Sequence, residues 1–340
     1  MPTWGQILNE LQTIKAPQEG GWDFDAIRRK YLKELHDYTK RAVIIYYTAF
    51  LEARPVPPQD LQIGLQDIPG FMEAVSNVEE KQLDLIIHSP GGSAEAAESI
   101  VTYLRKRFDH IRIFVPVAAM SAATMITLSA DEIVMGQHSQ LGPIDPQFTI
   151  QTPEGPRSAP AKAILNQFEL AKKECKEASN LAAWMPILRG YMPGLLTQCQ
   201  DSRNLAVTMV STWLKQYMFA NDIDGEVKAA AVADWFGDYD SFHAHGRRVS
   251  PDEAIAKGLK VIWLESDPKL QDAVLSVHHA VSHTFTGTGA TKIVENHHGR
   301  AWIKMNVPAF VKAPGQNPAT PGGTPTPNRA ERRRLEQGRK

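Results

Sequence analysis

Four short apolar runs alternate with segments of helical periodicity from residue 42 to about residue 150, and no other feature constrains the fold as strongly. Each run has the length of a strand and carries at most one charged residue, which is typical of strands buried on both faces of a parallel sheet. The runs are 42–47, 83–87, 111–115 and 132–135, and helices are expected between them at about 68–78, 94–108 and 121–129. The sequence therefore predicts the α/β class, with repeated β-α units and a mostly parallel sheet.

The second half of the chain begins with a helical segment. Long helices are predicted from residue 161 to about 220. Pro186 and Pro193 are expected to interrupt them, because proline has no amide hydrogen to donate. This segment lacks the strand-helix alternation of the preceding part. It is therefore interpreted as a helical arm or second layer added to the sheet.

After the arm, the alternation of helix and strand returns. Ser250 is followed by proline and, three residues on, by Glu253, the pattern of an N-cap with a capping box. Gly258 suits the position just past the end of that helix. The run 260–264 is the next predicted strand, and Asp267 can cap a helix that continues to about residue 282.

Composition divides the chain into three parts. Residues 1–22 are interpreted as an amphipathic or flexible N-terminal segment, and residues 23–305 as one folded domain. Residues 306–340 are rich in proline, glycine and basic side chains, with few apolar groups to offset the entropy of ordering. We expect this tail to be disordered. A nucleic-acid role for Arg332–Arg334 is a minor alternative to a solvated terminus.

Charge and cysteine content exclude several classes of protein. The net charge of −1, from 37 basic and 38 acidic side chains, gives no general attraction to nucleic acid or to an anionic membrane. Cys175 and Cys199 provide no framework of disulfides and suit a reducing compartment. The first twenty residues lack the layout of a signal peptide. The longest uncharged stretch, 113–130, contains Pro116, so no stable membrane span is expected, although peripheral membrane contact stays open. The expected location is cytoplasmic.

The histidines include two close pairs, His243 with His245 and His297 with His298. No carboxylate or cysteine pattern typical of metal ligands accompanies them, and neither C-x-x-C nor H-E-x-x-H occurs. The four imidazoles are therefore interpreted as surface groups. No metal ion and no cofactor is expected.

Two strand-to-helix junctions carry groups suited to acyl transfer. The motif Ser89–Gly92 ends in two glycines, whose amides can approach a ligand without a Cβ in the way. Ser121 opens a later helix, where its hydroxyl meets the positive end of the helix dipole and the Ala122 amide is free to donate. Gly91, Gly92 and Ala122 are thus candidates for an oxyanion hole that faces a serine nucleophile. A tight turn without a ligand and a plain N-cap serine are the structural alternatives.

The two junctions resemble those of the serine dehydrogenase proteinase family, which belongs to the Clp-protease/crotonase superfamily and is related to signal peptide peptidase A. The resemblance covers about residues 25–305. It is carried by 83–92 (LDLIIHSPGG), 119–126 (AMSAATMI), 129–136 (SADEIVMG) and 139–147 (SQLGPIDPQ), and 41–47 and 249–261 fit as well. The family usually has glycine in place of Ala123, where a methyl could narrow the oxyanion pocket. The resemblance implies a serine peptidase that acts on peptides or proteins and forms a homo-oligomer.

A serine hydroxyl needs a base to take its proton, and proteases of this superfamily use a histidine or a lysine. When the chain is lined up with the triad members, their histidine falls near Ile144 or Asp145, so a conventional triad is disfavoured. The Ser-Lys members place their lysine some forty residues downstream, and Lys162 stands 41 residues after Ser121 at a predicted helix start. His138 and Asp145 are lesser candidates, and Asp145 could instead orient the base or hold a turn.

Two other functions remain compatible with these residues. Crotonase relatives use the same pair of amides to hold a thioester enolate, so acyl-CoA chemistry without a serine nucleophile is one alternative. A non-catalytic oligomeric scaffold of the same fold is the other. Ser121→Ala would leave acyl-CoA chemistry intact, and a fluorophosphonate would fail to label a scaffold.

Overall fold

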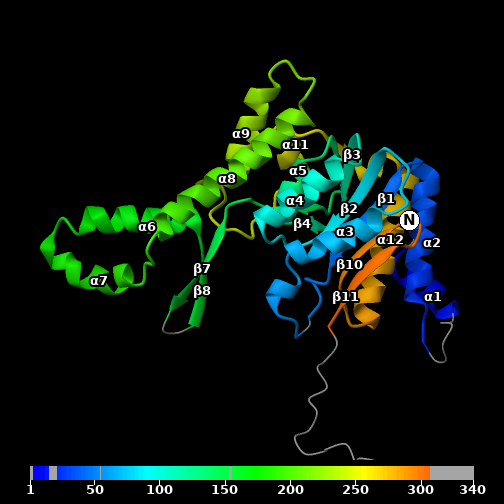
Figure 1. Ribbon diagram of the computed structural model, residues 1–340, viewed down its shortest axis with the longest axis horizontal. Helices are drawn as coiled ribbons and strands as arrows, with labels where there is room; N and C mark the ends of the chain where they lie inside the picture. Colours follow the sequence, from blue (N-terminus) through cyan, green and yellow to red (C-terminus); the bar gives the residue numbers. More distant parts are fainter. Residues whose placement is uncertain (1–2, 15–20, 54, 153–154, 307–340) are drawn as a thin grey trace, which may run out of the picture. The chain divides into compact units, whose positions relative to one another are not determined.

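A seven-stranded sheet lies at the centre of the computed structural model, which describes residues 3–14, 21–53, 55–152 and 155–306. Its order is β11-β10-β1-β2-β3-β5-β9 (Figure 1). Neighbours from β1 to β9 are parallel, whereas β1-β10 and β10-β11 pair antiparallel. The strands are β1 (Ala42–Thr48), β2 (Gln82–His88), β3 (His110–Val115), β5 (Glu132–Met135), β9 (Val261–Trp263), β10 (Ala290–Asn296) and β11 (Ala301–Met305). The predicted α/β class with a mostly parallel sheet is confirmed.

Helices cover both faces of this sheet and bury two apolar cores (Figure 1). Alternate residues of β1 enter different cores, as the period of a strand requires: Ile44 joins one and Ile45 the other. The first core is covered by α3 (Ile68–Val75), α4 (Ala94–Arg105), α5 (Ala122–Leu128), α8 (Leu195–Gln216) and α9 (Gly225–Gly237). The second is covered by α1 (Trp4–Thr13), α2 (Phe24–Thr39) and α12 (Pro268–Gly287). Burial on both faces explains the continuous apolar runs of the parallel strands.

The N-terminal segment contributes a helix to the second core. Thr3 caps α1 in a capping box with Gln6, and Ile7 and Leu11, one turn apart, are buried. Part of the segment expected to be amphipathic or flexible, residues 1–22, is therefore packed against α12. Apart from residue 306, the tail expected to be disordered, residues 306–340, lies outside the described residues.

The helical arm of the prediction is present. It consists of α6 (Ala161–Glu174), α7 (Leu181–Arg189) and α8, and α6 packs on α8. Pro193 precedes α8, but Pro186 lies inside α7, a short helix without buried residues. A hairpin of β7 (Gln147–Thr152) and β8 (Gly155–Pro160) leads directly into α6. Cys175 and Cys199 are free. None of the described helices is long and apolar enough to cross a bilayer.

The predicted helix at residue 250 is α11 (Pro251–Ala256), and Ser250 forms the capping box with Glu253. Gly258 adopts a positive φ of 94° just past its end, as expected of a C′ glycine. Asp267 caps α12. The remaining short elements are β4 (Ala118–Ala119), β6 (Gln140–Leu141), α10 (Tyr239–Phe242) and the 3-10 turns at Pro58–Asp60, Leu65–Asp67, Ala178–Asn180 and Leu264–Ser266.

Candidate active site

Ser121 stands at the N-terminus of α5 in a strained backbone conformation. Its φ of 51° and ψ of −119° lie in a backbone region that residues with a Cβ atom rarely adopt. The side chain makes no capping hydrogen bond, so the plain N-cap interpretation does not account for it. A sharp strand-to-helix turn that presents a free serine hydroxyl is the local geometry of a nucleophile elbow.

The double-glycine corner lies directly against this serine. A Cβ added to Gly91 would come within 2.7 Å of the Ser121 Cβ and 2.8 Å of the Ala122 nitrogen. The two chain segments are joined by backbone hydrogen bonds, from Ser89 N to Ala118 O and from Met120 N to Ser89 O. Since Gly91 also has a φ of 94°, only glycine fits this corner. The two junctions singled out in the sequence therefore form one site.

Two backbone amides at this corner are available to a ligand. The Gly91 N–H donates to Ser89 Oγ at 3.2 Å. The N–H groups of Gly92 and Ala122 have no acceptor in the described part of the chain, and the Ala122 amide lies at the positive end of the α5 dipole. Gly92 and Ala122 are therefore the free donors of the predicted oxyanion hole.

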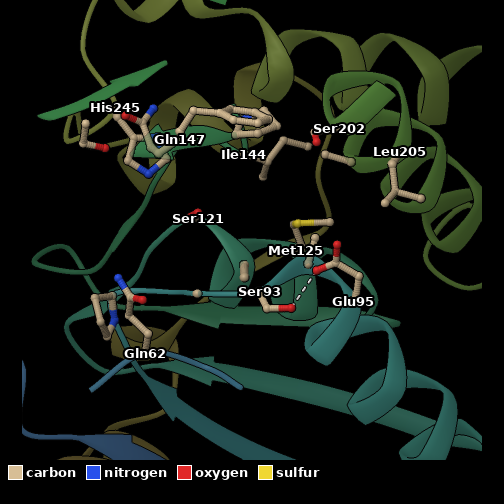
Figure 2. Close-up of a pocket in the computed structure, with 18 of the residues that line it drawn as sticks. Gln62, Ser93, Glu95, Ser121, Met125, Ile144, Gln147, Ser202, Leu205 and His245 are labelled. Carbon is tan, nitrogen blue, oxygen red and sulfur yellow. Dashed lines mark hydrogen bonds between the residues drawn. The ribbon is translucent and has the colours of Figure 1, made fainter. Parts of the chain in front are cut away.

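Ser121 opens into a cavity of about 560 Å³. Figure 2 shows the serine between two walls, with His245, Gln147 and Ile144 on one side and Gln62, Ser93 and Glu95 on the other. The full lining also includes Pro90, Gly92, Ala94, Ala122, Met125, Pro146, Phe148, Thr149, Ser158, Ser202, Leu205 and Ala206. A groove with this mixture of apolar and polar groups has room for a peptide segment.

Glu95 supplies a negative charge at this cavity. The Ser93 hydroxyl donates to its carboxylate at 2.7 Å. This hydrogen bond, followed by one from the Glu95 backbone amide, holds the pKa of the Glu95 carboxyl below its usual value. The side chain is therefore ionised at neutral pH.

The cavity contains a histidine that the sequence analysis assigned to the surface. His245 lines it, and its Nδ1 lies 2.8 Å from Oδ1 of Asp145, which is 1% exposed. Gln147 Nε2 donates to the other oxygen of the same carboxylate. Asp145 thus holds the ring of an imidazole at the cavity. His245 follows α10 in a loop and had no local signal beyond its pairing with His243.

The other candidate bases lie outside the residues that line the cavity. Lys162 is the second residue of α6, and its Nζ is 3.8 Å from Oδ2 of Asp240. The helix start itself is fixed near the cavity, since the Ala161 amide donates to the carbonyl of Pro146, a lining residue. His138 is exposed in the turn between β5 and β6.

Residues 58–185 match the family model of the ClpP-like SDH-type serine proteinases. This segment contains Ser121, the glycine corner and the start of α6. This part of the chain is therefore similar to the members of that family. The finding agrees with the resemblance carried by residues 83–147.

Two uncharacterized proteins of Methanocaldococcus jannaschii are similar to parts of this chain. One is 35% identical over 138 residues, which is 40% of this chain and 48% of the relative. The other is 38% identical over 87 residues, which is 25% of this chain and 30% of the relative. The chain thus spans less than half the length of either.

Three solved structures share a distant likeness with this chain. Two are alanine mutants of the 1510-N membrane-bound stomatin-specific protease, the second in complex with a substrate peptide. The first is 17% identical, with a TM-score of 0.39, and the match covers 62% of this chain and 79% of that chain. The second is 19% identical, with a TM-score of 0.36, and the match covers 59% of this chain and 70% of that chain. The third is the ClpP catalytic domain of Plasmodium falciparum, with 14% identity, a TM-score of 0.30 and coverage of 67% and 89%.

Ala123, where this family usually has glycine, leaves the cavity open. Its side chain is fully buried in the first core, and it is absent from the residues that line the cavity. Its amide donates to Met120 O at 2.9 Å. The methyl therefore packs away from the free amides of Gly92 and Ala122.

Proposed function

We propose that the chain is a serine peptidase in which Ser121 attacks the carbonyl carbon of a peptide bond. One observation carries the proposal: a strained serine without a capping bond stands at the N-terminus of α5, against a glycine corner with free amides, inside one cavity. The amides of Gly92 and Ala122 would hold the oxyanion. Gly91 fixes the close approach of the two segments, and its own amide would join only if its bond to Ser89 opened.

The proposed reaction proceeds in two halves. The Ser121 Oγ forms a bond to the carbonyl carbon while its proton passes to the base, and the carbonyl oxygen becomes an anion held by the two amides. The carbon-nitrogen bond then breaks, and the amine leaves with the proton from the base. In the second half, water gives a proton to the base and bonds to the acyl carbon; the bond from this carbon to Ser121 Oγ then breaks, the base returns the proton to Oγ, and the acid is released.

We assign the base to Lys162, as the family resemblance implies. Its helix start is bonded to Pro146 at the cavity wall. Within the described residues its ammonium group has no hydrogen bond; it lies 3.8 Å from Oδ2 of Asp240 and also attracts the carboxylate of Asp238. Its side chain is 29% exposed. The role requires the side chain to turn from Asp240 toward Ser121.

His245 is the second candidate for the base, because it lines the cavity and Asp145 holds its ring. Ser121, His245 and Asp145 would then form a triad. Its histidine comes from a different place in the chain than the position near Ile144 or Asp145 at which the triad proteases have theirs. If Lys162 is the base, His245 is instead a group that binds the substrate.

Single substitutions separate these two assignments. Lys162→Met is expected to lower kcat/KM about 10²- to 10⁴-fold, as for loss of a general base. His245→Gln is expected to cost about tenfold, mainly in KM, because a substrate contact alone is lost. The measurement is peptide hydrolysis by the full chain, and Lys172→Met, an exposed lysine on the same helix, is the control. A larger loss in His245→Gln than in Lys162→Met would assign the base to His245.

Labelling by a fluorophosphonate distinguishes the peptidase from its rivals. Covalent modification mapped to Ser121 by mass spectrometry is the expected result, because only an activated serine reacts. An inert serine in correctly folded protein would favour the scaffold. Acyl-CoA turnover that survives Ser121→Ala would favour the enolate chemistry.

We propose that the chain forms a homo-oligomer through its helical arm. The arm leaves several large apolar side chains exposed, namely Leu170, Leu181, Met185, Ile187 and Met192. Such a concentration is typical of a contact surface. Sedimentation of the full chain is expected to show an assembly larger than one chain, and Leu181→Lys with Met185→Lys is expected to dissociate it. A monomer at all concentrations would contradict the proposal.

A further inference from the structure

Three helices meet at one end of the cavity that contains Ser121. Met125 stands one turn after the serine on α5, Leu205 and Ala206 come from α8, and Glu95 comes from the first turn of α4. Helix α5 contacts both α4 and α8. Figure 2 shows Met125, Leu205 and Glu95 on the same side of Ser121. This end of the cavity therefore combines apolar walls with a carboxylate.

The Glu95 carboxylate is charged but has no cationic partner in the part of the chain that the structure describes. The Ser93 hydroxyl and the Glu95 amide hold the pKa of this carboxyl below its usual value. Neither group carries a full positive charge, and the N-terminus of α4 corresponds to only about half of one. The side chain is exposed, so a negative charge remains available to a ligand.

The rest of the cavity wall supplies no matching cation. Within the described residues, no lysine or arginine lines it. The other ionisable side chain of the lining is His245, which lies on the opposite wall (Figure 2). Its Nδ1 is 2.8 Å from the Asp145 carboxylate, so a proton on that ring is matched there and does not neutralise Glu95.

The remaining histidines of the two close pairs add no charge to the cavity. His243 and His298 are exposed, as expected, and neither lines it. His297 is buried just past the end of β10, where its Nδ1 accepts the Val43 amide hydrogen at 3.2 Å. The interpretation of His297 as a surface group is therefore wrong. The charge of the cavity lining is set by Glu95 and is negative.

We propose that this end of the cavity is a basic subsite, formed by Met125, Leu205, Ala206 and Glu95, that binds a lysine or arginine side chain of the substrate. The proposal rests on the peptidase function proposed above and names its substrate class. The aliphatic stem of such a side chain packs on the apolar walls while its charged head meets the Glu95 carboxylate. An arginine offers two parallel N–H donors to that carboxylate.

A basic side chain fits the subsite better than an apolar or an acidic one. An apolar side chain of the same length would cover the Glu95 carboxylate and remove water from it without replacing the lost hydrogen bonds. An acidic side chain would place a like charge beside it. The preferred substrates are therefore peptides with lysine or arginine close to the bond that is cleaved.

The first test is the sequence preference of the full chain. Casein is digested, and the cleavage sites are mapped by mass spectrometry; lysine and arginine are expected to be enriched at one position relative to the cleaved bond. A synthetic peptide with arginine at that position should have a kcat/KM about tenfold above that of the same peptide with citrulline, which has nearly the same shape without the charge.

Substitutions at Glu95 connect the preference to the subsite. Glu95→Gln keeps an acceptor for the Ser93 hydroxyl and is expected to abolish the difference between the arginine and citrulline peptides. Glu95→Lys is expected to favour a glutamate peptide over the arginine peptide. The matched control is Glu98→Gln, an exposed carboxylate one turn further along α4 that does not line the cavity; it should keep the preference. A merely structural role of Glu95 would change the hydrolysis of all three peptides alike.

A binding measurement separates this proposal from the catalytic one. Fluorescence anisotropy with the Ser121→Ala chain is expected to show about tenfold tighter binding of a labelled alanine peptide with a central arginine than of its citrulline counterpart. The added substitution Glu95→Gln should remove that difference. Hydrolysis without a charge preference, a preference that survives Glu95→Gln, or equal or undetectable binding of both peptides would overturn the basic subsite. Absence of hydrolysis would contradict the peptidase, and the binding comparison would still decide the subsite.

Discussion

Ser121→Ala is expected to lower kcat/KM for peptide hydrolysis by at least about 10⁴-fold, because the acyl-enzyme then has no oxygen on which to form. The loss should appear in kcat more than in KM, since the cavity walls and the Gly92 and Ala122 amides remain in place. Labelling by fluorophosphonate should disappear in the same variant. Peptide hydrolysis and labelling of the purified full chain measure both effects.

The same position also gives a prediction about stability. Alanine keeps a Cβ at φ 51° and ψ −119°, so Ser121→Ala should retain the backbone strain. Glycine at this position would remove the backbone strain, which costs about 1–3 kcal/mol of folding free energy. Part of that gain is offset because glycine has more conformational freedom in the unfolded chain. Ser121→Gly is therefore expected to be inactive yet about 1–2 kcal/mol more stable than Ser121→Ala in urea denaturation. Such a result would mean that the fold bears strain at this serine for its chemistry.

Ser99→Ala is the control, since this serine is exposed on α4 and donates only to the Glu95 carbonyl. Its activity should equal that of the parent chain. Full activity of Ser121→Ala would contradict the peptidase proposal and favour chemistry that needs no nucleophilic serine. Equal stability of the alanine and glycine variants would mean that the backbone at position 121 is not strained.

The parallel strands could be predicted because their signal is local. The four inner strands β1, β2, β3 and β5 are largely buried on both faces, so each is a nearly continuous apolar run in the sequence. Strand β10 gave no such signal, since it carries Lys292 and Glu295, both fully buried. Their charges are matched by Asp67 and by Arg28, each more than two hundred residues away in the chain. A single run of sequence does not reveal such pairing, and the antiparallel edge of the sheet was therefore missed.

The residues of the candidate site likewise differ in whether the sequence alone could predict their positions. The glycine corner and Ser121 could be brought together from sequence, because the carboxyl ends of neighbouring parallel strands meet at one edge of the sheet. His245 could not, because it meets Asp145 across a separation of 100 residues from a loop without periodicity. Residues that long loops carry to the cavity are the part of this site that only the fold reveals.

The buried ion pair between Lys292 and Asp67 lies next to the chain segment that contacts the glycine corner of the candidate site. Both side chains are fully buried, and Lys292 Nζ lies 2.8 and 2.9 Å from the two carboxylate oxygens. The same ammonium donates to the carbonyl of Gln62. The next residue, Ile63, donates its amide to Gly91 O at 2.7 Å. The ion pair thus holds Gln62 in place, and the adjoining Ile63 is hydrogen-bonded to the glycine corner.

Lys292→Met is expected to lower the free energy of unfolding by about 3–5 kcal/mol, because it leaves the Asp67 carboxylate buried without its counter-charge. The double variant Lys292→Met with Asp67→Asn should recover much of that loss, since no unpaired charge remains. Lys304→Met, which breaks the partly exposed pair with Asp60, should cost at most about 1 kcal/mol. Chemical denaturation measures all three. A single-variant loss as small as that of Lys304→Met would mean that water reaches Asp67, and the glycine corner would then need another support.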